Sequence, residues 1–304
     1  MKDQAAVSGS RRGYLNKDFE FFHLKDRKIM EFELHFHDFN KIIIFISGNV
    51  TYLIEGRAYK LKPWDMLLIS SSEIHKAIVG TSGTYERMII WVNSNFLHKH
   101  NSPEGDLLKC FDIASKEKRN ILRLNPKLLR QGKHILSQLE EECKNGGFGS
   151  QVLKNSLFLQ FIVYLNRIYL EPDSIEHKAD GDYDESIGEV IRHINENICE
   201  DMPIESLASR FYMSKYHLMH KFKSQTGYTI HSYILQKRLM MANTFIKSGR
   251  SIAEACAECG FGDYSSFVRA FKRMYGLSPK KHMKMVEELE NNCLNEKVSS
   301  SLKD

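Results

Sequence analysis

An internal repeat in the last third of the chain limits what it can fold into more than any other feature. Two runs, which start at Ile204 and Ile252, share one pattern of apolar residues, and the second copy has a single extra residue in its turn. Self-similarity of this kind indicates two copies of one small structural unit. The aligned pairs include Leu207 with Ala255, Ala208 with Cys256, Phe211 with Cys259, Leu218 with Phe267, Phe222 with Phe271, and Gly227 with Gly276.

Each copy predicts two short helices joined by a turn. Apolar residues recur at i, i+3, i+4 and i+7 from Ile204 and again from Ile252, which is the spacing of one buried helix face. Ser214 in the first copy and Asp263 in the second can cap the following helix, because their side-chain oxygens accept hydrogen bonds from free backbone amides. A helix, a turn and a second helix with its own exposed face describe a DNA-binding helix-turn-helix unit.

The second helix of each copy leaves a basic and polar face exposed. Cations, hydroxyls and an imidazole suit phosphates and base edges, and two matching faces favour this function over a merely solvated surface. Residues 229–246 contain no Gly or Pro and predict one connecting helix of about 27 Å, long enough to set two recognition helices about 34 Å apart, one turn of DNA. The exposed residues are Lys215, Tyr216, Met219, His220 and Lys223, and then Tyr264, Ser265, Ser266, Arg269, Lys272 and Arg273.

The distribution of charge divides the chain at the same place. Residues 203–284 hold 14 Lys or Arg against 4 Asp or Glu, whereas the remainder holds 29 against 34. A basic region after a mildly acidic one predicts a polyanionic partner for the C-terminal part. Composition alone does not separate DNA from RNA or from an acidic membrane surface, so the motifs must decide.

The first third of the chain predicts a β sandwich or a small barrel. Short runs of strand-forming residues alternate with turn residues such as Glu55-Gly56-Arg57, a pattern typical of antiparallel strands. Together with the helical C-terminal part, this gives an α+β multidomain fold. The predicted strands are residues 30–36, 41–46, 50–54, 58–61, 66–69 and 85–92.

Two amphipathic helices are expected next, over residues 125–143 and 149–170. The second has a broad apolar face around Phe158 and Phe161, which either meets a second subunit of a homodimer or simply covers the barrel. A polar stretch without periodicity follows. We therefore expect a barrel at 15–105, a helical dimerisation segment at 106–172, a linker at 173–183, a DNA-binding domain at 184–287 and a tail at 288–304.

Residues 203–283 resemble the AraC/XylS family of bacterial transcription regulators. The resemblance is carried by Ile204-Glu205-Ser206-Leu207-Ala208, Met213-Ser214-Lys215-Tyr216-His217-Leu218, Arg238, Gly260-Phe261, Asp263-Tyr264 and Ser278-Pro279, among other residues. It implies that double-stranded DNA is read by Tyr216, Met219 and His220 in the first recognition helix and by Ser265, Ser266 and Arg269 in the second. Met219 offers only an apolar contact, for example to a thymine methyl group. Lys215, Lys223, Lys272 and Arg273 flank the reading face and are expected on phosphates.

The N-terminal region resembles the cupin-like sensor domain of many such regulators, through His35-Phe36-His37, Gly48, Gly56, Lys62-Pro63-Trp64-Asp65 and His75. Metal-binding cupins add a Glu a few residues after the His pair. Lys41 stands at that position here and opposes a cation, so we expect no metal, no cofactor and no enzymatic activity.

The expected effector site contains His35, His37, Trp64 and His75. The effector is a small molecule, with a sugar as one candidate, because Trp64 and Trp91 can stack on a sugar or on an aromatic effector. Either ring can instead belong to the core. A ligand pocket is favoured over a barrel that serves only dimerisation. The predicted function is a transcription regulator controlled by this effector, with an effector-independent regulator as the alternative and RNA polymerase as a further candidate partner.

The cysteines and the apolar residues indicate the cytoplasm. No run approaches the roughly 20 apolar residues of a membrane span, and the start of the chain lacks the apolar core of a signal peptide. Six scattered cysteines are typical of reduced thiols. Cys256 and Cys259 have the spacing of a zinc or redox pair, but they occupy the buried positions of Ala208 and Phe211 in the repeat, which favours core packing.

Overall fold

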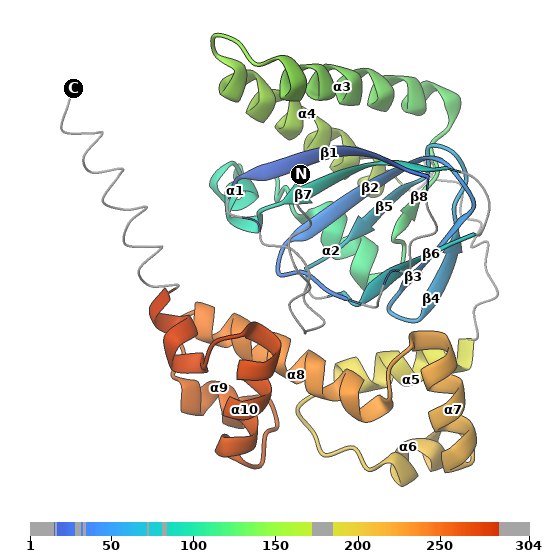
Figure 1. The fold of residues 1–304 in the computed structure, drawn as a ribbon, viewed down its shortest axis with the longest axis vertical. Helices are drawn as coiled ribbons and strands as arrows, with labels where there is room; N and C mark the ends of the chain where they lie inside the picture. Colours follow the sequence, from blue (N-terminus) through green and yellow to red (C-terminus); the bar gives the residue numbers. More distant parts are fainter. Residues whose placement is uncertain are drawn as a thin grey trace. The chain divides into compact units, whose positions relative to one another are not determined.

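The computed structural model describes residues 15, 17–27, 32, 35–71, 73–80, 84–171 and 185–285, which belong to two compact units (Figure 1). The N-terminal unit contains the described residues up to 171, and the C-terminal unit contains 185–285. The expected linker at 173–183, the expected tail at 288–304 and most of the expected strand at 30–36 lie outside the described residues. None of the described helices is both long and apolar enough to cross a membrane.

The N-terminal unit is built on two antiparallel sheets. The larger sheet has the strand order β1-β7-β2-β5-β8 and the smaller one has the order β4-β3-β6. Glu55 and Gly56 both have positive φ angles, of 47° and 78°, and form the tight turn between β3 and β4 that the sequence predicts. The strands are β1 (Phe19–Asp26), β2 (Asn40–Ser47), β3 (Val50–Ile54), β4 (Arg57–Lys60), β5 (Met66–Ile69), β6 (His75–Val79), β7 (Tyr85–Val92) and β8 (Ile121–Leu122).

Apolar side chains on the two faces of the larger sheet belong to two separate cores. Ile90 of β7 packs with Phe158 in a core shared with the helices, whereas Tyr85 of the same strand packs with Phe45 and Tyr52 in a core between the two sheets. Successive side chains of a strand point to opposite faces, so one strand serves both cores. The second core adjoins the candidate effector site.

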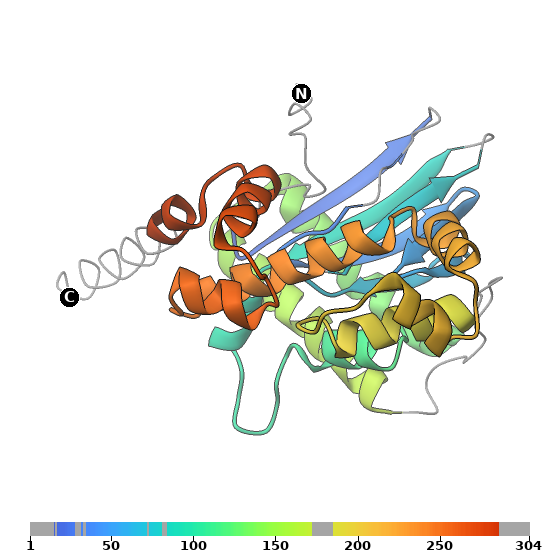
Figure 2. The same ribbon diagram turned by 90° about the horizontal axis from the view of Figure 1, so that it is seen from below.

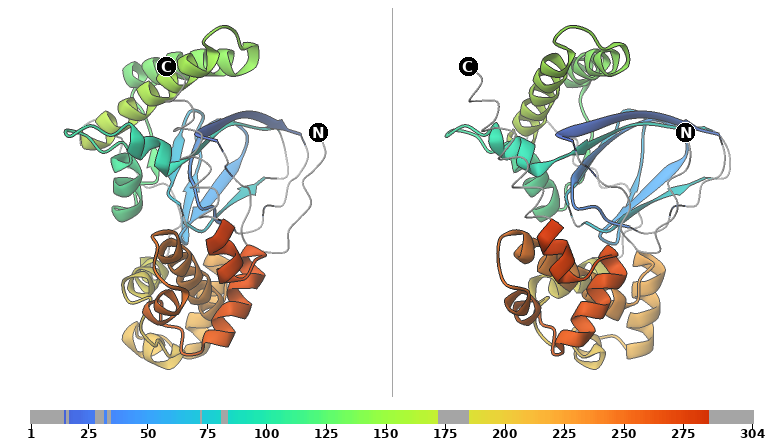
Figure 3. Two further views of the ribbon diagram at one scale, coloured as in Figure 1. Left: turned by 90° about the vertical axis from the view of Figure 1, so that its left-hand side faces the viewer. Right: turned by 60° about the vertical axis from the view of Figure 1, so that its left-hand side comes forward.

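Four helices follow the last long strand: α1 (Ser94–Lys99), α2 (Lys109–Lys116), α3 (Pro126–Asn145) and α4 (Ser150–Leu170). Asn125 caps α3 by accepting hydrogen bonds from the amides of Lys127 and Leu128. α3 and α4 lie side by side next to the larger sheet (Figures 1 and 3). Phe158 and Phe161 are fully buried in the core of this unit, so they are not the surplus apolar surface that their sequence pattern suggested for a second subunit.

The C-terminal unit confirms the repeat. One helix pair is α6 (Ile204–Arg210) and α7 (Lys215–Thr226), and the other is α9 (Ile252–Glu258) and α10 (Tyr264–Tyr275). They are preceded by α5 (Glu185–Glu196), joined by the single helix α8 (Ile230–Lys247), and followed by helical residues 279–285 (Figures 1 and 2).

The two copies use the same local chemistry at the ends of their second helices. Ser214 and Asp263 are the N-caps of α7 and α10, as predicted, and both helices end at a glycine, Gly227 or Gly276, with φ of 77°. Only glycine adopts this left-handed conformation without steric cost. Cys256 and Cys259 are buried, with 5% and 0% exposure, which confirms that they pack in the core.

Candidate nucleic-acid interface and effector site

Helix α7 presents a polar face because its apolar side chains are turned inward. Leu218 and Phe222 are fully buried, whereas Tyr216 is 79% exposed and Met219 is 41% exposed. The Tyr216 and His220 rings stack, with their centroids 6.2 Å apart. The three residues expected to read bases in the first module therefore share one exposed surface.

Helix α10 repeats this arrangement with different side chains. Phe267 and Phe271 are fully buried, and Ser265, Ser266 and Arg269 are exposed. The Arg269 guanidinium donates a hydrogen bond from Nη2 to Ser266 Oγ at 3.1 Å. This contact holds the planar fork beside the N-terminal end of α10, where a recognition helix meets base edges.

The expected phosphate contacts surround these two faces. Lys223, Lys272 and Arg273 are all exposed. Lys215 is exposed as well, but its ammonium is already ion-paired with the carboxylate of Glu205, and this contact lowers the pKa of Glu205. Lys215 must therefore exchange Glu205 for a phosphate if it contacts DNA, whereas the other three cations lie ready on the surface.

The structure brings three of the four expected effector residues together. His35 and His75 form a β-bridge, in which each backbone amide donates to the carbonyl of the other, at 3.1 and 2.9 Å. His37 completes a triangle of buried imidazoles, with ring centroids 4.5 to 5.1 Å apart. The two histidines of the His-x-His pair thus face a histidine that lies far from them in the sequence.

His75 is the most deeply buried member of this triangle. Burial lowers its pKa well below the usual range, and the neighbouring His35 and Lys41 lower it further, so the ring is neutral. Its Nδ1 atom lies 2.9 Å from the carbonyl oxygen of Glu73, which makes Nδ1 the protonated donor. The buried Nε2 atom has no hydrogen-bond partner within the described part of the chain.

Aromatic residues border the histidines, and Phe39 stacks on His37 with the ring centroids 4.5 Å apart. The Trp91 ring lies 6.1 Å from the His37 ring, and its buried Nε1–H also lacks a partner among the described residues. Tyr52 stacks at 6.4 Å from His75, and burial raises the pKa of its hydroxyl well above the usual range, so it remains protonated. Trp91 was one of two candidate stacking rings in the sequence, whereas Tyr52 carried no signal beyond its alternate position in a predicted strand.

Trp64 lies elsewhere. Its ring packs against the core shared with the helices, and the ammonium of Lys133 from α3 lies 3.8 Å from the ring centroid. The structure therefore does not place Trp64 with the three histidines.

The histidine triangle also has the donors of a metal site. One ligand atom from each of His35, His37 and His75 can be chosen so that all three lie within 4.8 Å of one another. Lys41 is buried near them, and its charge, which lowers the pKa of His75, would also repel a dication. We keep the expectation that no metal is bound, as a prediction to be tested.

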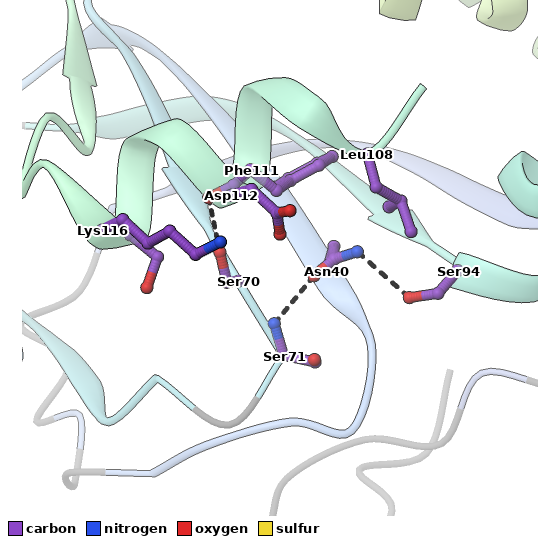
Figure 4. A pocket seen from close by; sticks show the side chains of 9 residues that line it. Asn40, Ser70, Ser71, Ser94, Leu108, Phe111, Asp112 and Lys116 are labelled. Atoms are coloured by element: carbon purple, nitrogen blue, oxygen red, sulfur yellow. Dashed lines mark hydrogen bonds between the residues drawn. The ribbon is translucent and has the colours of Figure 1, made fainter. Parts of the chain in front are cut away.

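A pocket of about 250 Å³ elsewhere in this unit was not expected from the sequence (Figure 4). Asn40 donates to Ser94 Oγ at 3.1 Å and accepts from the Ser71 amide at 2.8 Å, while Ser70 Oγ donates to the Phe111 carbonyl at 3.0 Å. These bonds join the ends of β2 and β5 to each other and to α1 and α2, so the polar groups serve to hold the elements together.

Two known families match the two units. The family described as AraC-like ligand binding domain matches residues 29–162, and the family described as Helix-turn-helix domain matches residues 207–285. The match of two families in this order covers more than two thirds of the chain.

Curated relatives match this chain over most of their length. The transcriptional activator RhaR of Mannheimia succiniciproducens is 26% identical over 83% of this chain and 87% of its own, and the activator RhaS of Klebsiella pneumoniae is 24% identical over 82% and 86%. Among solved structures, the DNA-binding domain of the transcriptional factor AdpA in complex with a target DNA is 27% identical, covering 33% of this chain and 91% of its own, with a TM-score of 0.32.

The matches identify a DNA-binding part and a ligand-binding part, and the curated relatives are transcriptional activators, not enzymes. They agree with the two exposed recognition helices and with the buried polar cluster of the N-terminal unit. The chain therefore belongs to the AraC family, as a DNA-binding regulator of transcription with an N-terminal ligand-binding domain.

Proposed function

We propose that one chain reads two successive major grooves of a DNA duplex through α7 and α10, and that a small polyhydroxylated molecule bound in the N-terminal unit controls this binding. A sugar or a related polyol fits best. The location of the effector site is beside His35, His37 and His75, and it includes Trp91 in place of Trp64.

The observation that carries the effector assignment is the pair of buried polar atoms at His75 Nε2 and Trp91 Nε1. A buried polar atom without a hydrogen bond costs about 1–3 kcal/mol, so such atoms point to a partner outside the described chain. One is an acceptor and the other a donor, and a sugar hydroxyl can serve either. A ligand with several hydroxyls can therefore satisfy both atoms and stack on the Trp91 ring.

DNA reading is assigned to both modules. Arg269 offers a fork that pairs with the O6 and N7 atoms of guanine, Tyr216 and His220 offer hydrogen bonds, and Met219 offers an apolar contact to a thymine methyl group. Lys215, Lys223, Lys272 and Arg273 are assigned to phosphates, because all four are exposed on the two recognition helices.

Three further assignments complete the proposal. The chain forms a homodimer through its N-terminal unit, where Phe148 is fully exposed and Val152 is 72% exposed beside it at the start of α4. It acts in the cytoplasm, where its DNA target lies. Because the two curated relatives are named activators, we assign activation through contact with RNA polymerase to this chain as well.

Thermal unfolding of the full chain with a panel of aldoses, ketoses, uronates and polyols tests the effector site. A ligand that binds only the folded state raises the free energy of unfolding by about 2.7 kcal/mol at a concentration of 100 Kd. We expect His75→Gln and Trp91→Phe to lose the ligand-induced shift and Trp64→Phe to keep it. A shift that survives His75→Gln would place the ligand elsewhere, and no shift with any compound would favour a barrel that serves only dimerisation.

A further inference from the structure

One arginine in the connecting helix joins the segment before the first helix-turn-helix module to the second module. Arg238 lies in the middle of α8, and its guanidinium donates three hydrogen bonds to backbone carbonyls. Nε donates to Ile198 at 2.8 Å and Nη2 to Glu200 at 2.6 Å, in the segment that follows α5, while Nη1 donates to Gly260 at 2.7 Å, in the turn between α9 and α10. A single side chain therefore ties the segment before the first module to the turn of the second.

The two copies of the repeat show that this tie is specific to the second module. Gly260 aligns with Tyr212 of the first copy, and both residues have positive φ, of 75° and 54°. The turn itself therefore accepts a side chain in this conformation, and Tyr212 is 98% exposed. At Gly260, however, a Cβ atom would lie 2.3 Å from the carbonyl oxygen of Cys199 and 3.1 Å from Cζ of Arg238. Glycine is needed at 260 because the neighbouring segment lies directly against it.

The turn that Arg238 contacts lies directly before α10, which carries the second reading face. Phe261 follows Gly260, and its ring packs 4.9 Å from the ring of Phe267, which anchors α10 in the core. Arg238, Gly260 and Arg269 also line one continuous groove of the C-terminal unit. Arg238 is therefore connected to α10 through two residues of the turn, Gly260 and Phe261.

We propose that Arg238 and Gly260 form a joint that fixes the position of the second recognition helix relative to the first, and so sets the spacing of the two DNA half-sites. Arg238 is a positioning residue in this role, because it acts through the turn and not on a base. The inference rests on the proposed reading of two grooves by one chain. Two linked modules bind DNA about 10²–10⁴ times more tightly than either module alone when the link holds them at the spacing of the two half-sites. This gain in affinity is smaller when the link is loose.

The test uses the full chain and a DNA site selected with the wild-type protein. Three duplexes are compared by fluorescence anisotropy: the selected site, the site with the second half scrambled, and the site with five base pairs inserted between the halves. We expect Arg238→Ala to bind the selected site about 10-fold more weakly, to bind the scrambled site as the wild type does, and to lose most of the penalty for the insertion.

Two further variants and a control keep the test decisive. Gly260→Ala disturbs the joint from the other side and should give the same reduced spacing penalty. Arg238→Lys, whose ammonium cannot make the three bonds of a planar guanidinium, should lie between the wild type and Arg238→Ala, and it carries the test if the alanine variant does not fold. Arg192→Ala is the matched control, because it removes the same charge from the same unit, and Arg192 is exposed on α5, where it pairs with Glu189 of the same helix.

The outcomes separate the joint from the proposed reading of two grooves. If the wild type itself shows no preference for two half-sites, the proposal that one chain reads two grooves is refuted, and so is the proposed role of the joint. If the wild type shows that preference and Arg238→Ala keeps the full spacing penalty, only the joint is refuted. If Arg238→Ala lost as much affinity for the scrambled site as for the selected site, Arg238 would only stabilise the fold. This result would also overturn the proposal.

Discussion

Arg269 should be the strongest single determinant of sequence preference. Of the residues assigned to base reading, it alone offers a planar fork for guanine, and the 3.1 Å hydrogen bond to Ser266 Oγ already restrains this fork. A free arginine side chain loses about 2 kcal/mol of rotamer entropy when it is fixed, so the restraint lowers the cost of binding. Arg269→Ala should therefore weaken binding and relax specificity at one guanine of the half-site read by α10.

The expected size of the effect follows from the contact. A bidentate pair with guanine contributes about 1–3 kcal/mol of discrimination against the wrong base. This corresponds to a factor of about 5 to 150 in affinity between the correct site and its point variant. Ser266→Ala should reduce discrimination by less, about 0.5–1.5 kcal/mol, because it removes the hydrogen bond that orients the fork and, at the base edge, only a neutral hydroxyl.

Binding of the variants to the selected site and its point mutants, across a salt series, gives the answer. Lys223→Ala is the control, because an exposed lysine expected on a phosphate should weaken all sequences alike and lower the salt slope by about one. The reasoning is refuted if Arg269→Ala lowers affinity for every sequence by the same factor. Arg269 would then contact only the backbone, and the assigned reading face would be wrong.

Four other predictions concern the two units separately. Asp263→Ala removes the oxygens that cap α10 and should lower the free energy of unfolding by about 1 kcal/mol in urea titration; an unchanged midpoint would show that the cap contributes nothing. Phe148→Asp combined with Val152→Asp should make the chain monomeric in sedimentation, and a persistent dimer would place the interface elsewhere. Burial keeps His75 neutral in the folded state, so only the unfolded state takes up a proton at this residue as the pH falls below about 6.5. The free energy of unfolding should therefore drop there by up to about 1.4 kcal/mol per pH unit. His75→Gln should remove this part of the pH dependence, and an unaltered pH profile of the variant would contradict the prediction. Elemental analysis should find no stoichiometric transition metal, whereas about one zinc, iron or manganese per chain would show that Lys41 does not prevent binding.

The C-terminal unit could be predicted closely from the sequence because its signals are local. Helix periodicity, the caps at Ser214 and Asp263 and the terminal glycines Gly227 and Gly276 all act within a few residues of the elements that they define. The tie from Arg238 to Gly260 was not visible, because it depends on how distant segments pack. The repeat held one indication of this contact, because the first copy has Tyr212 at the position where the second copy has Gly260.

The N-terminal unit was predicted less completely because its strands depend on their partners. β1, β6 and the two-residue β8 were missed. The apolar residues of β1 break their alternation at Phe21-Phe22 and only Phe19 is buried, so this strand lacks a period-two pattern and is held by pairing with β7. The approach of His75 to His35 depends on a β-bridge that no local pattern reveals. The apolar width of α4 indicated burial correctly but not its partner, because contacts with the sheet and α3 already bury Phe158 and Phe161.

Hydroxyl-radical footprinting of the full chain on its selected DNA tests most directly whether α7 and α10 read successive grooves. The account predicts, for each bound chain, two protected patches on one face of the duplex, separated by one helical turn of about 10–10.5 base pairs. Arg269→Ala should weaken the patch that belongs to the second module more than the other. A single protected patch, or two patches half a turn apart on opposite faces, would contradict the account.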